Sequence, residues 1–230
     1  MREIIFDTET TGLSFSAGDR LVEIGCVEMI NRVETGRVFH AYVNPQRPMP
    51  AAAQAVHGLS DAFLADKPLF TDIVEDLLAF IDGDAPLVAH NASFDFGFLN
   101  GELGLCGRPI VPLDRMVDTQ AIARVRHPGA KHSLDALCAR YGIDQSRRTF
   151  HGALLDAQLL AQVYVELSGG RQIGLGLAEE RSDAIAVSDS LVEQVVRPPR
   201  HFAPSEEELA RHRRFVADLT SPLWGEETVH

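Results

Sequence analysis

Three short runs near the start of the chain have the hydrophobic pattern of β-strands. Residues 4–9 start apolar and then turn polar, residues 21–29 alternate over part of their length, and residues 37–43 end at Asn44-Pro45. Short strands at this spacing, with turn-forming residues between them, are typical of an antiparallel meander. We therefore expect the chain to begin with three antiparallel strands.

The spacing of apolar residues becomes helical further along the chain. Helices are expected at residues 71–81, Ser93–Leu99, 134–141 and 152–167. Ser93 and Ser133 are suited to cap two of them, and Gly142 to end the third. Short buried strands are expected at residues 86–90 and 116–119. This order of elements predicts an α/β domain with a mixed sheet.

The composition changes after the last of these helices. Residues 168–200 are rich in Gly, Ser, Asp and Glu with scattered aliphatic residues, which is typical of a linker. Ser205 and the three glutamates that follow it mark the start of a further short helix. We therefore divide the chain into a folded domain at 1–170, a flexible linker at 171–200 and a tail at 201–230.

The charge balance excludes one class of nucleic-acid-binding protein. The 230 residues include 33 Asp or Glu and 21 Lys or Arg, a net charge of -12, whereas proteins that hold nucleic acid by bulk charge are usually basic. Three isolated cysteines without a CxxC pair argue against a disulfide framework or cysteine zinc site. No run approaches the ~18 apolar residues of a membrane span, and the first residues lack a secretory signal. We expect a cytoplasmic protein that does not bind membranes.

Asp7 and Glu9 are the first candidates for chemistry. They lie two positions apart on an expected strand, so both carboxylates point to the same side of the sheet. Two charges about 4 Å apart repel by roughly 4 kcal/mol at an effective dielectric constant near 20. A bound divalent cation offsets this repulsion. The alternative is that both acids are solvated at the end of the strand.

Three further candidates lie near expected helix starts. Asp95 would occupy the first turn after Ser93, where an acid also serves simply to favour the helix. His151 and Asp156 would be separated by about 140° if both lay on one helix. They converge more easily if His151 precedes the helix, where a loop histidine near carboxylates suits a general base. The alternative is a surface histidine.

Taken together, these residues supply the parts for hydrolysis of a phosphodiester with two metal ions. The predicted ligands are all carboxylates, namely Asp7, Glu9, Asp95 and Asp156. Oxygen ligands suit Mg²⁺ or Mn²⁺. The sequence therefore predicts two divalent cations, with His151 beside them.

Three segments resemble known nuclease motifs. Residues 6–12, 90–95 and 151–156 are similar to the three exonuclease motifs of the DEDD superfamily, in its histidine-containing branch. Residues 131–141 resemble the proofreading subunits of bacterial DNA polymerase III. The resemblance extends over about residues 1–170. It implies a ribonuclease H-like fold, with a mixed five-stranded sheet flanked by helices, and 3′→5′ exonuclease activity that removes mispaired 3′-terminal nucleotides from DNA.

The resemblance also assigns roles to individual residues. It implies that Asp7 bridges both metal ions, that Glu9 and Asp156 complete one metal site and that Asp95 supports the other. It makes His151 the acceptor of the proton from the attacking water. Contacts with the frayed or single-stranded 3′ end are assigned to Asp7, Thr8, Glu9, His57, His90, Asn91 and Asp156. For His57 the alternative is a structural loop histidine.

The C-terminal segments resemble docking elements of replication proteins. Gln172, Leu175 and Leu177, within residues 172–177, resemble the short peptide that binds the sliding clamp; the alternative is a Gly-rich linker with incidental leucines. The segment that ends near Trp224 resembles the tail that binds the polymerase catalytic (alpha) subunit; the alternative is packing on its own domain. A small accessory subunit stays open, because the sequence carries no motif for one.

Two other functions fit the same sequence. The metal chemistry does not distinguish DNA from RNA, so a free-standing 3′→5′ exonuclease that trims RNA or short oligonucleotides is one alternative. A mainly structural subunit that stabilises the polymerase is the other. The complete set of acids argues against the structural subunit, and the tail argues for a polymerase partner.

Overall fold

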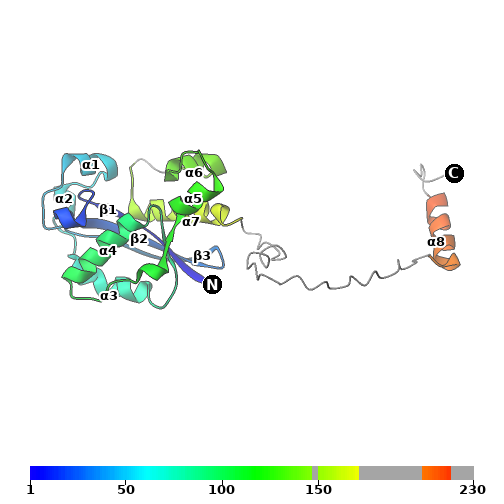
Figure 1. The fold of residues 1–230 in the computed structure, drawn as a ribbon, viewed down its shortest axis with the longest axis horizontal. Coiled ribbons are helices and arrows are strands. Elements are labelled where there is room, and N and C mark those ends of the chain that lie inside the picture. The colour runs from blue at the N-terminus through cyan, green and yellow to red at the C-terminus, as the bar shows by residue number, and fades with distance from the viewer. Residues whose placement is uncertain (147–149, 171–203, 219–230) are drawn as a thin grey trace, which may run out of the picture. The chain divides into compact units, whose positions relative to one another are not determined.

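The computed structural model describes residues 1–146, 150–170 and 204–218, which belong to two separate units. The first unit contains a sheet with helices on both faces (Figure 1). The second contains the helix α8 (Glu206–Ala217), which Ser205 begins through a capping box with Glu208, as its sequence predicts.

The sheet has five strands in the order β3-β2-β1-β4-β5. The strands are β1 (Arg2–Thr10), β2 (Leu21–Ile30), β3 (Val33–Tyr42), β4 (Leu87–Ala89) and β5 (Met116–Asp118). The first three pair antiparallel, which confirms the predicted meander. β4 and β5 continue the sheet in parallel with β1. The mixed five-stranded sheet of the predicted fold class is therefore present.

Seven helices accompany this sheet among the described residues of the first unit. They are α1 (Ala51–His57), α2 (Asp61–Leu64), α3 (Phe70–Phe80), α4 (Ser93–Leu105), α5 (Thr119–Arg126), α6 (Leu134–Tyr141) and α7 (Ala153–Leu167). Two short 3₁₀ turns lie at Phe15–Ala17 and Leu113–Arg115. The sequence pattern predicts α3, α4, α6 and α7 but not α1, α2 or α5. α1 and α2 are seven and four residues long, which is too short for a helical period to stand out. α5 has eight residues, as many as α6, but it is followed by His127 and lacks a terminal glycine such as Gly142 of α6.

The helix ends follow the expected residues with one exception. Ser133 accepts a hydrogen bond from the backbone of Ala136 at the start of α6, and Gly142 ends that helix with φ +66°. The expected cap at Ser93 is wrong, because Ser93 is the first residue of α4 itself. The chain turns at Asn91 instead, which has φ +62° and accepts the backbone N–H of Phe94.

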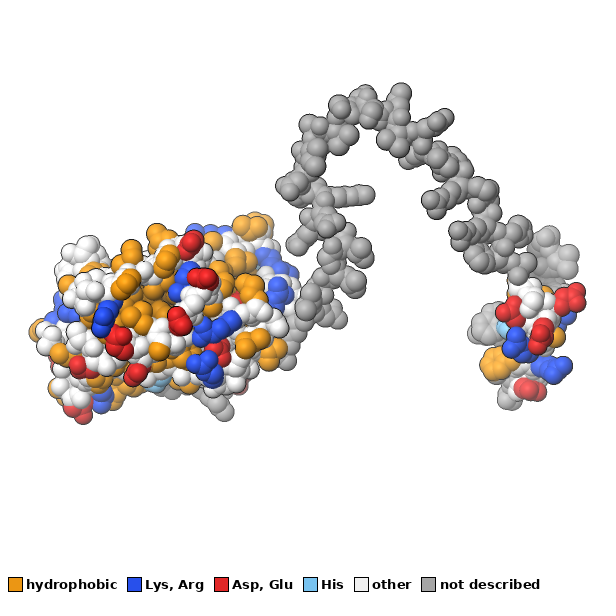
Figure 2. All heavy atoms as spheres, turned by 90° about the horizontal axis from the view of Figure 1, so that it is seen from below, with side chains coloured by type: hydrophobic (Ala, Val, Ile, Leu, Met, Phe, Trp, Pro, Cys, Tyr) orange, Lys and Arg blue, Asp and Glu red, His pale blue; other side chains and the backbone are white. Residues whose placement is uncertain are grey.

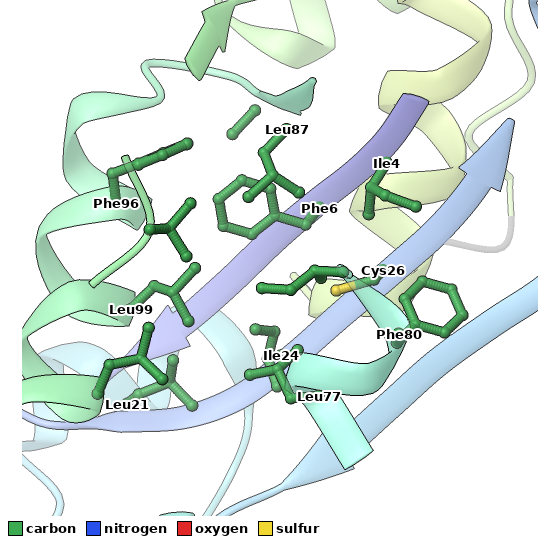
Figure 3. Close-up of a cluster of buried hydrophobic side chains, with 14 of the residues drawn as sticks. Ile4, Phe6, Leu21, Ile24, Cys26, Leu77, Phe80, Leu87, Phe96 and Leu99 are labelled. Carbon is green, nitrogen blue, oxygen red and sulfur yellow. The ribbon is translucent and has the colours of Figure 1, made fainter. Parts of the chain in front are cut away.

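Alternate residues of β1 face two different layers of helices. Ile4 and Phe6 are fully buried against α3 and α4, in the cluster shown in Figure 3. Ile5 points to the opposite face and packs with apolar residues of α5, α6 and α7. The C-terminal end of β1 therefore emerges between the two layers, with Asp7 and Glu9 on the α7 face and Thr8 on the α4 face.

The surface gives no sign of strong charge segregation on the face shown in Figure 2, where acidic and basic side chains are interspersed. The net charge of -12 is thus not gathered into one acidic patch on that face. Within the part of the chain that the structure describes, no helix is long and apolar enough to cross a bilayer.

Candidate active site

The register of β1 with β2 determines which residues lie beside Asp7 and Glu9. Asp7 lies opposite Gly25, and Glu9 lies opposite Glu23. Gly25 has no side chain where α7 approaches: a Cβ there would lie 2.3 Å from the backbone nitrogen of Leu154. The first turn of α7 can therefore rest directly on β2, beside the two acids of β1.

That first turn carries Asp156, and His151 precedes it in the loop. The Nδ1 atom of His151 lies 3.2 Å from Oδ2 of Asp156, although the two residues are five positions apart. The backbone N–H of His151 also donates to the carbonyl of Val56, 3.3 Å away, which ties the loop to α1. The expected placement of His151 ahead of the helix is therefore confirmed. A neutral ring that donates from Nδ1 leaves Nε2 as a proton acceptor.

Glu9, His151 and Asp156 form a compact group of potential metal ligands. One ligand atom from each of the three side chains lies within 4.8 Å of the others. Glu9 and Asp156 are 9% and 3% exposed, and two buried carboxylates so close together repel strongly unless a cation offsets their charge. Oxygen donors of this kind fit a hard divalent cation. The chemistry of the donor set therefore suits the predicted metal.

Asp95 approaches the same region from α4. Its Oδ1 accepts a hydrogen bond from Thr8 Oγ1 at 2.7 Å, and the side chain is buried. Burial raises the pKa of Asp95 to about 7, the hydrogen bond from Thr8 acts in the opposite direction, and the charge of Asp118 adds a small further rise. Thr8 thus fixes one oxygen of Asp95 from the strand that carries Asp7 and Glu9.

A cavity of about 350 Å³ unites these groups. It is lined by Asp7, Thr8, Glu9, His90, Asn91, Phe94, Asp95, Gln120, Ser133, Leu134, Asp135, His151 and Asp156. All four predicted metal ligands, the predicted base and the predicted substrate contacts at Thr8, His90 and Asn91 are in this set. Their functional roles stay predictions, but their convergence is a property of the fold.

His57 is the one candidate in the described residues that does not line the cavity. It is buried at the C-terminal end of α1, and its Nδ1 accepts the backbone N–H of Leu59 at 3.0 Å. Burial lowers the pKa of His57, and the charge of Glu23 partly opposes this effect. His57 follows Val56, whose carbonyl binds the His151 loop, so it stands beside the site.

Several lining residues were not among the candidates. Ser133, Leu134 and Asp135 lie in the segment that resembles polymerase subunits, so that resemblance could have drawn attention to them. Gln120 had no such signal. Phe94 is half-buried and reaches the cavity, whereas Phe96 and Phe98 are buried packing residues. The tail candidates Gln172, Leu175, Leu177 and Trp224 lie outside the described residues.

Comparisons with known proteins agree with this geometry. A family model described as an exonuclease (RNase_T) matches residues 4–164. A Rickettsia felis protein named DNA polymerase III subunit epsilon is 47% identical over 223 residues, which are 95% of this chain and 97% of that protein. Exonuclease X, solved with 5′-overhanging duplex DNA, is 30% identical with a TM-score of 0.56, over 72% of this chain and 90% of the other.

A more distant structure shares the fold. The nuclease domain of 3′hExo, described as a DEDDh family member bound to rAMP, is 17% identical with a TM-score of 0.62, over 73% of this chain and 92% of the other. The predicted ribonuclease H-like fold and the resemblance to exonucleases are thus confirmed. Dependence on divalent metal follows for this class of enzyme. The chain belongs to the RNase_T family of exonucleases.

Proposed function

We propose that this protein is the 3′→5′ proofreading exonuclease subunit of a replicative DNA polymerase III. The observation that carries the proposal is the convergence of Glu9, His151 and Asp156 within 4.8 Å, in one cavity with Asp7 and Asp95. The name of the Rickettsia felis relative supports the assignment to this polymerase. A cytoplasmic location is part of the same proposal.

Two divalent cations, Mg²⁺ or Mn²⁺, would be held by the carboxylates. We assign Asp7 to both ions, Glu9 and Asp156 to one and Asp95 to the other. Bound there, the ions would activate water and stabilise the leaving oxygen. The hydrogen bond from Thr8 keeps the carboxylate of Asp95 turned toward the end of β1, which supports its place in the second site.

His151 is assigned as the general base. In the tautomer that donates from Nδ1 to Asp156, 3.2 Å away, Nε2 is the nitrogen that would accept a proton from the attacking water. The side chain is 46% exposed, which lets the ring give that proton back to solvent after each turnover. The partnership with a carboxylate resembles the way many enzymes fix the tautomer of a basic histidine.

The remaining assignments concern substrate and partners. Thr8, His90 and Asn91 would contact the terminal nucleotide from within the cavity, and His57 from beside it. Residues 172–177 would bind the sliding clamp, and the segment 201–230 would bind the catalytic alpha subunit. α8 supports the second assignment, because Leu209 and Phe215 on this helix are 37% and 61% exposed and exposed apolar side chains of this kind mark interfaces.

The test is hydrolysis of a primer–template with a mismatched 3′ end, compared with a matched DNA primer and an RNA oligonucleotide. We expect Mg²⁺-dependent release of mononucleotides from DNA, fastest at the mismatch, and its loss in Asp7→Asn with folding retained. Release that is fastest from RNA would favour the free-standing exonuclease. Undiminished activity of Asp7→Asn would remove the metal assignment.

A further inference from the structure

The cavity has a second group of polar residues that the metal chemistry does not use. Asn91 lies just before α4, Gln120 lies in the first turn of α5, and Ser133 caps α6; all three line the cavity. We call these three residues the donor wall, because each side chain carries N–H or O–H groups.

The amide of Gln120 has a defined orientation. Arg124, one turn further along α5, donates a hydrogen bond from Nη2 to Oε1 of Gln120. This bond occupies the carbonyl oxygen and leaves the amide N–H groups as the free polar end of the side chain. Gln120 lines the cavity, so its amide N–H groups can donate hydrogen bonds to a ligand there.

Hydrogen bonds to neighbouring residues hold the backbone of the donor wall in place. Asp118 Oδ1 accepts the backbone N–H of Asn91 at 3.0 Å and that of Gln120 at 2.9 Å, so one carboxylate joins two parts of the wall. His90 adds a second brace through Thr119 Oγ1 at 2.9 Å and the carbonyl of His132 at 2.8 Å. Such support holds binding groups in place before a ligand arrives.

The charge of the cavity explains why neutral donors suit this place. Its described lining includes five acids, and neither Lys nor Arg is among them. A Lys or Arg side chain inside the cavity would pair with these carboxylates, whereas a neutral amide does not. An amide can therefore bind a phosphodiester close to the acids, as many protein–DNA phosphate contacts do.

We propose that Gln120 binds the phosphodiester on the 5′ side of the scissile one, in the strand that the enzyme retains. This inference rests on the proposed function. Asn91 is assigned to the terminal nucleotide, and Asp118 joins the backbone of Gln120 to that of Asn91. We therefore assign the linkage next to the terminal nucleotide to Gln120. Gln120 is thus a substrate-binding residue, and Arg124 is a positioning residue that acts through it.

Three substrates separate this contact from the chemistry. The first is a single-stranded DNA oligonucleotide, and the second is the same oligonucleotide with a neutral methylphosphonate at the linkage next to the scissile one. The third is the p-nitrophenyl ester of thymidine 5′-monophosphate, which has no second linkage. Each is assayed with the full chain and Mg²⁺, and thermal unfolding of every variant is recorded.

We expect Gln120→Ala to raise KM for the oligonucleotide roughly tenfold, the usual size of a lost hydrogen bond to a charged group, with a much smaller change in kcat. Gln120→Glu should raise KM further, because a carboxylate repels the phosphate. Arg124→Met should act in the same direction with a smaller effect. The KM effect of Gln120→Ala should be at least fivefold smaller for the ester and for the methylphosphonate.

Gln162→Glu is the matched control, since it adds the same charge at an exposed position of α7 outside the cavity. Equal losses on the oligonucleotide and the ester would overturn the proposal, as would an undiminished loss on the methylphosphonate or no loss on the oligonucleotide. If the natural chain itself hydrolyses neither DNA nor the ester, the proposed function fails. If it hydrolyses both and Gln120→Ala matches it, only this inference fails.

Discussion

Gly25 of β2 lies directly against the backbone of Leu154 in the first turn of α7. A Cβ at position 25 would lie 2.3 Å from the nitrogen and 2.4 Å from the Cα of Leu154. Backbone atoms cannot move aside as the tip of a flexible side chain can. This contact therefore sets how closely α7 approaches the sheet, and with it the position of Asp156 relative to Asp7, the strand partner of Gly25.

Gly25→Ala is expected to impair the site by moving α7 outward. We expect a loss of about 1–3 kcal/mol in the free energy of unfolding, as for other overpacked interiors. We also expect a fall in kcat that remains under conditions where the variant is fully folded. The reason is that Asp156 would shift away from Glu9 and Asp7. Urea unfolding and exonuclease rates at a temperature where the variant stays folded measure the two effects separately.

Gly104→Ala is the control for that substitution. Gly104 lies inside α4, has no positive φ, and a Cβ there would meet no other atom within 4 Å. Because alanine favours helices over glycine by roughly 0.5–1 kcal/mol, this variant should be as stable as the natural chain or slightly more so, with normal activity. An active Gly25→Ala would show that α7 does not depend on the contact.

His151→Ala is expected to slow hydrolysis by roughly 10²–10⁴-fold, the usual range for a general base, while Mn²⁺ binding is largely kept. Added imidazole should restore part of the rate, because it can take the proton in place of the missing ring. Steady-state rates with and without imidazole, and Mn²⁺ titrations by electron paramagnetic resonance, test these points. Normal turnover in the variant would remove His151 from this role.

The sequence predicts the catalytic candidates of the site better than it predicts the other residues that line the cavity. Asp7 and Glu9 share a strand face by a local rule, and the argument that brings His151 to Asp156 needs only the start of one helix. Gln120 reaches the cavity because β5 pairs with β4 and delivers the start of α5 there. That pairing joins residues about 30 positions apart, and no local pattern announces it.

The same limit applies to Gly25. Glycine in a strand pattern suggests a close approach of some kind, but the sequence does not say of what. The partner, Leu154, lies more than 120 residues later and is chosen by the packing of α7 across two strands. The sequence alone predicts the chemical groups of the site, whereas tertiary contacts of this type determine its geometry.

The pH dependence of stability should carry a contribution from His90. Burial lowers the pKa of His90, and the hydrogen bond to the carbonyl of His132 opposes this only in part. An unfolded histidine takes up its proton near pH 6.5, whereas folded His90 does so only at lower pH. The unfolded state therefore binds more protons below about pH 6.5, and the free energy of unfolding falls as the pH falls.

His90→Gln should remove that contribution. The loss of stability between pH 7.5 and 5.5 is expected to be smaller in the variant than in the natural chain, with each unit of pKa shift worth ~1.4 kcal/mol. Urea unfolding at the two pH values measures it, and His212→Gln, at an exposed position of α8, controls for the loss of a histidine. Parallel pH dependences of H90Q and the natural chain would contradict the prediction.

Cutting the chain after Gly170 should separate catalysis from assembly. The first unit contains both large apolar cores, on either face of the sheet, so the fragment 1–170 is expected to fold and to keep its exonuclease activity. It should no longer co-purify with the polymerase or the clamp.

A point variant refines the test. Phe215→Ser changes a side chain that is 61% exposed on α8, so it should weaken binding of the polymerase without lowering the stability of the first unit. Co-purification of the fragment with the alpha subunit would show that the polymerase is held by the exonuclease domain instead, and the assignment of the tail would be wrong.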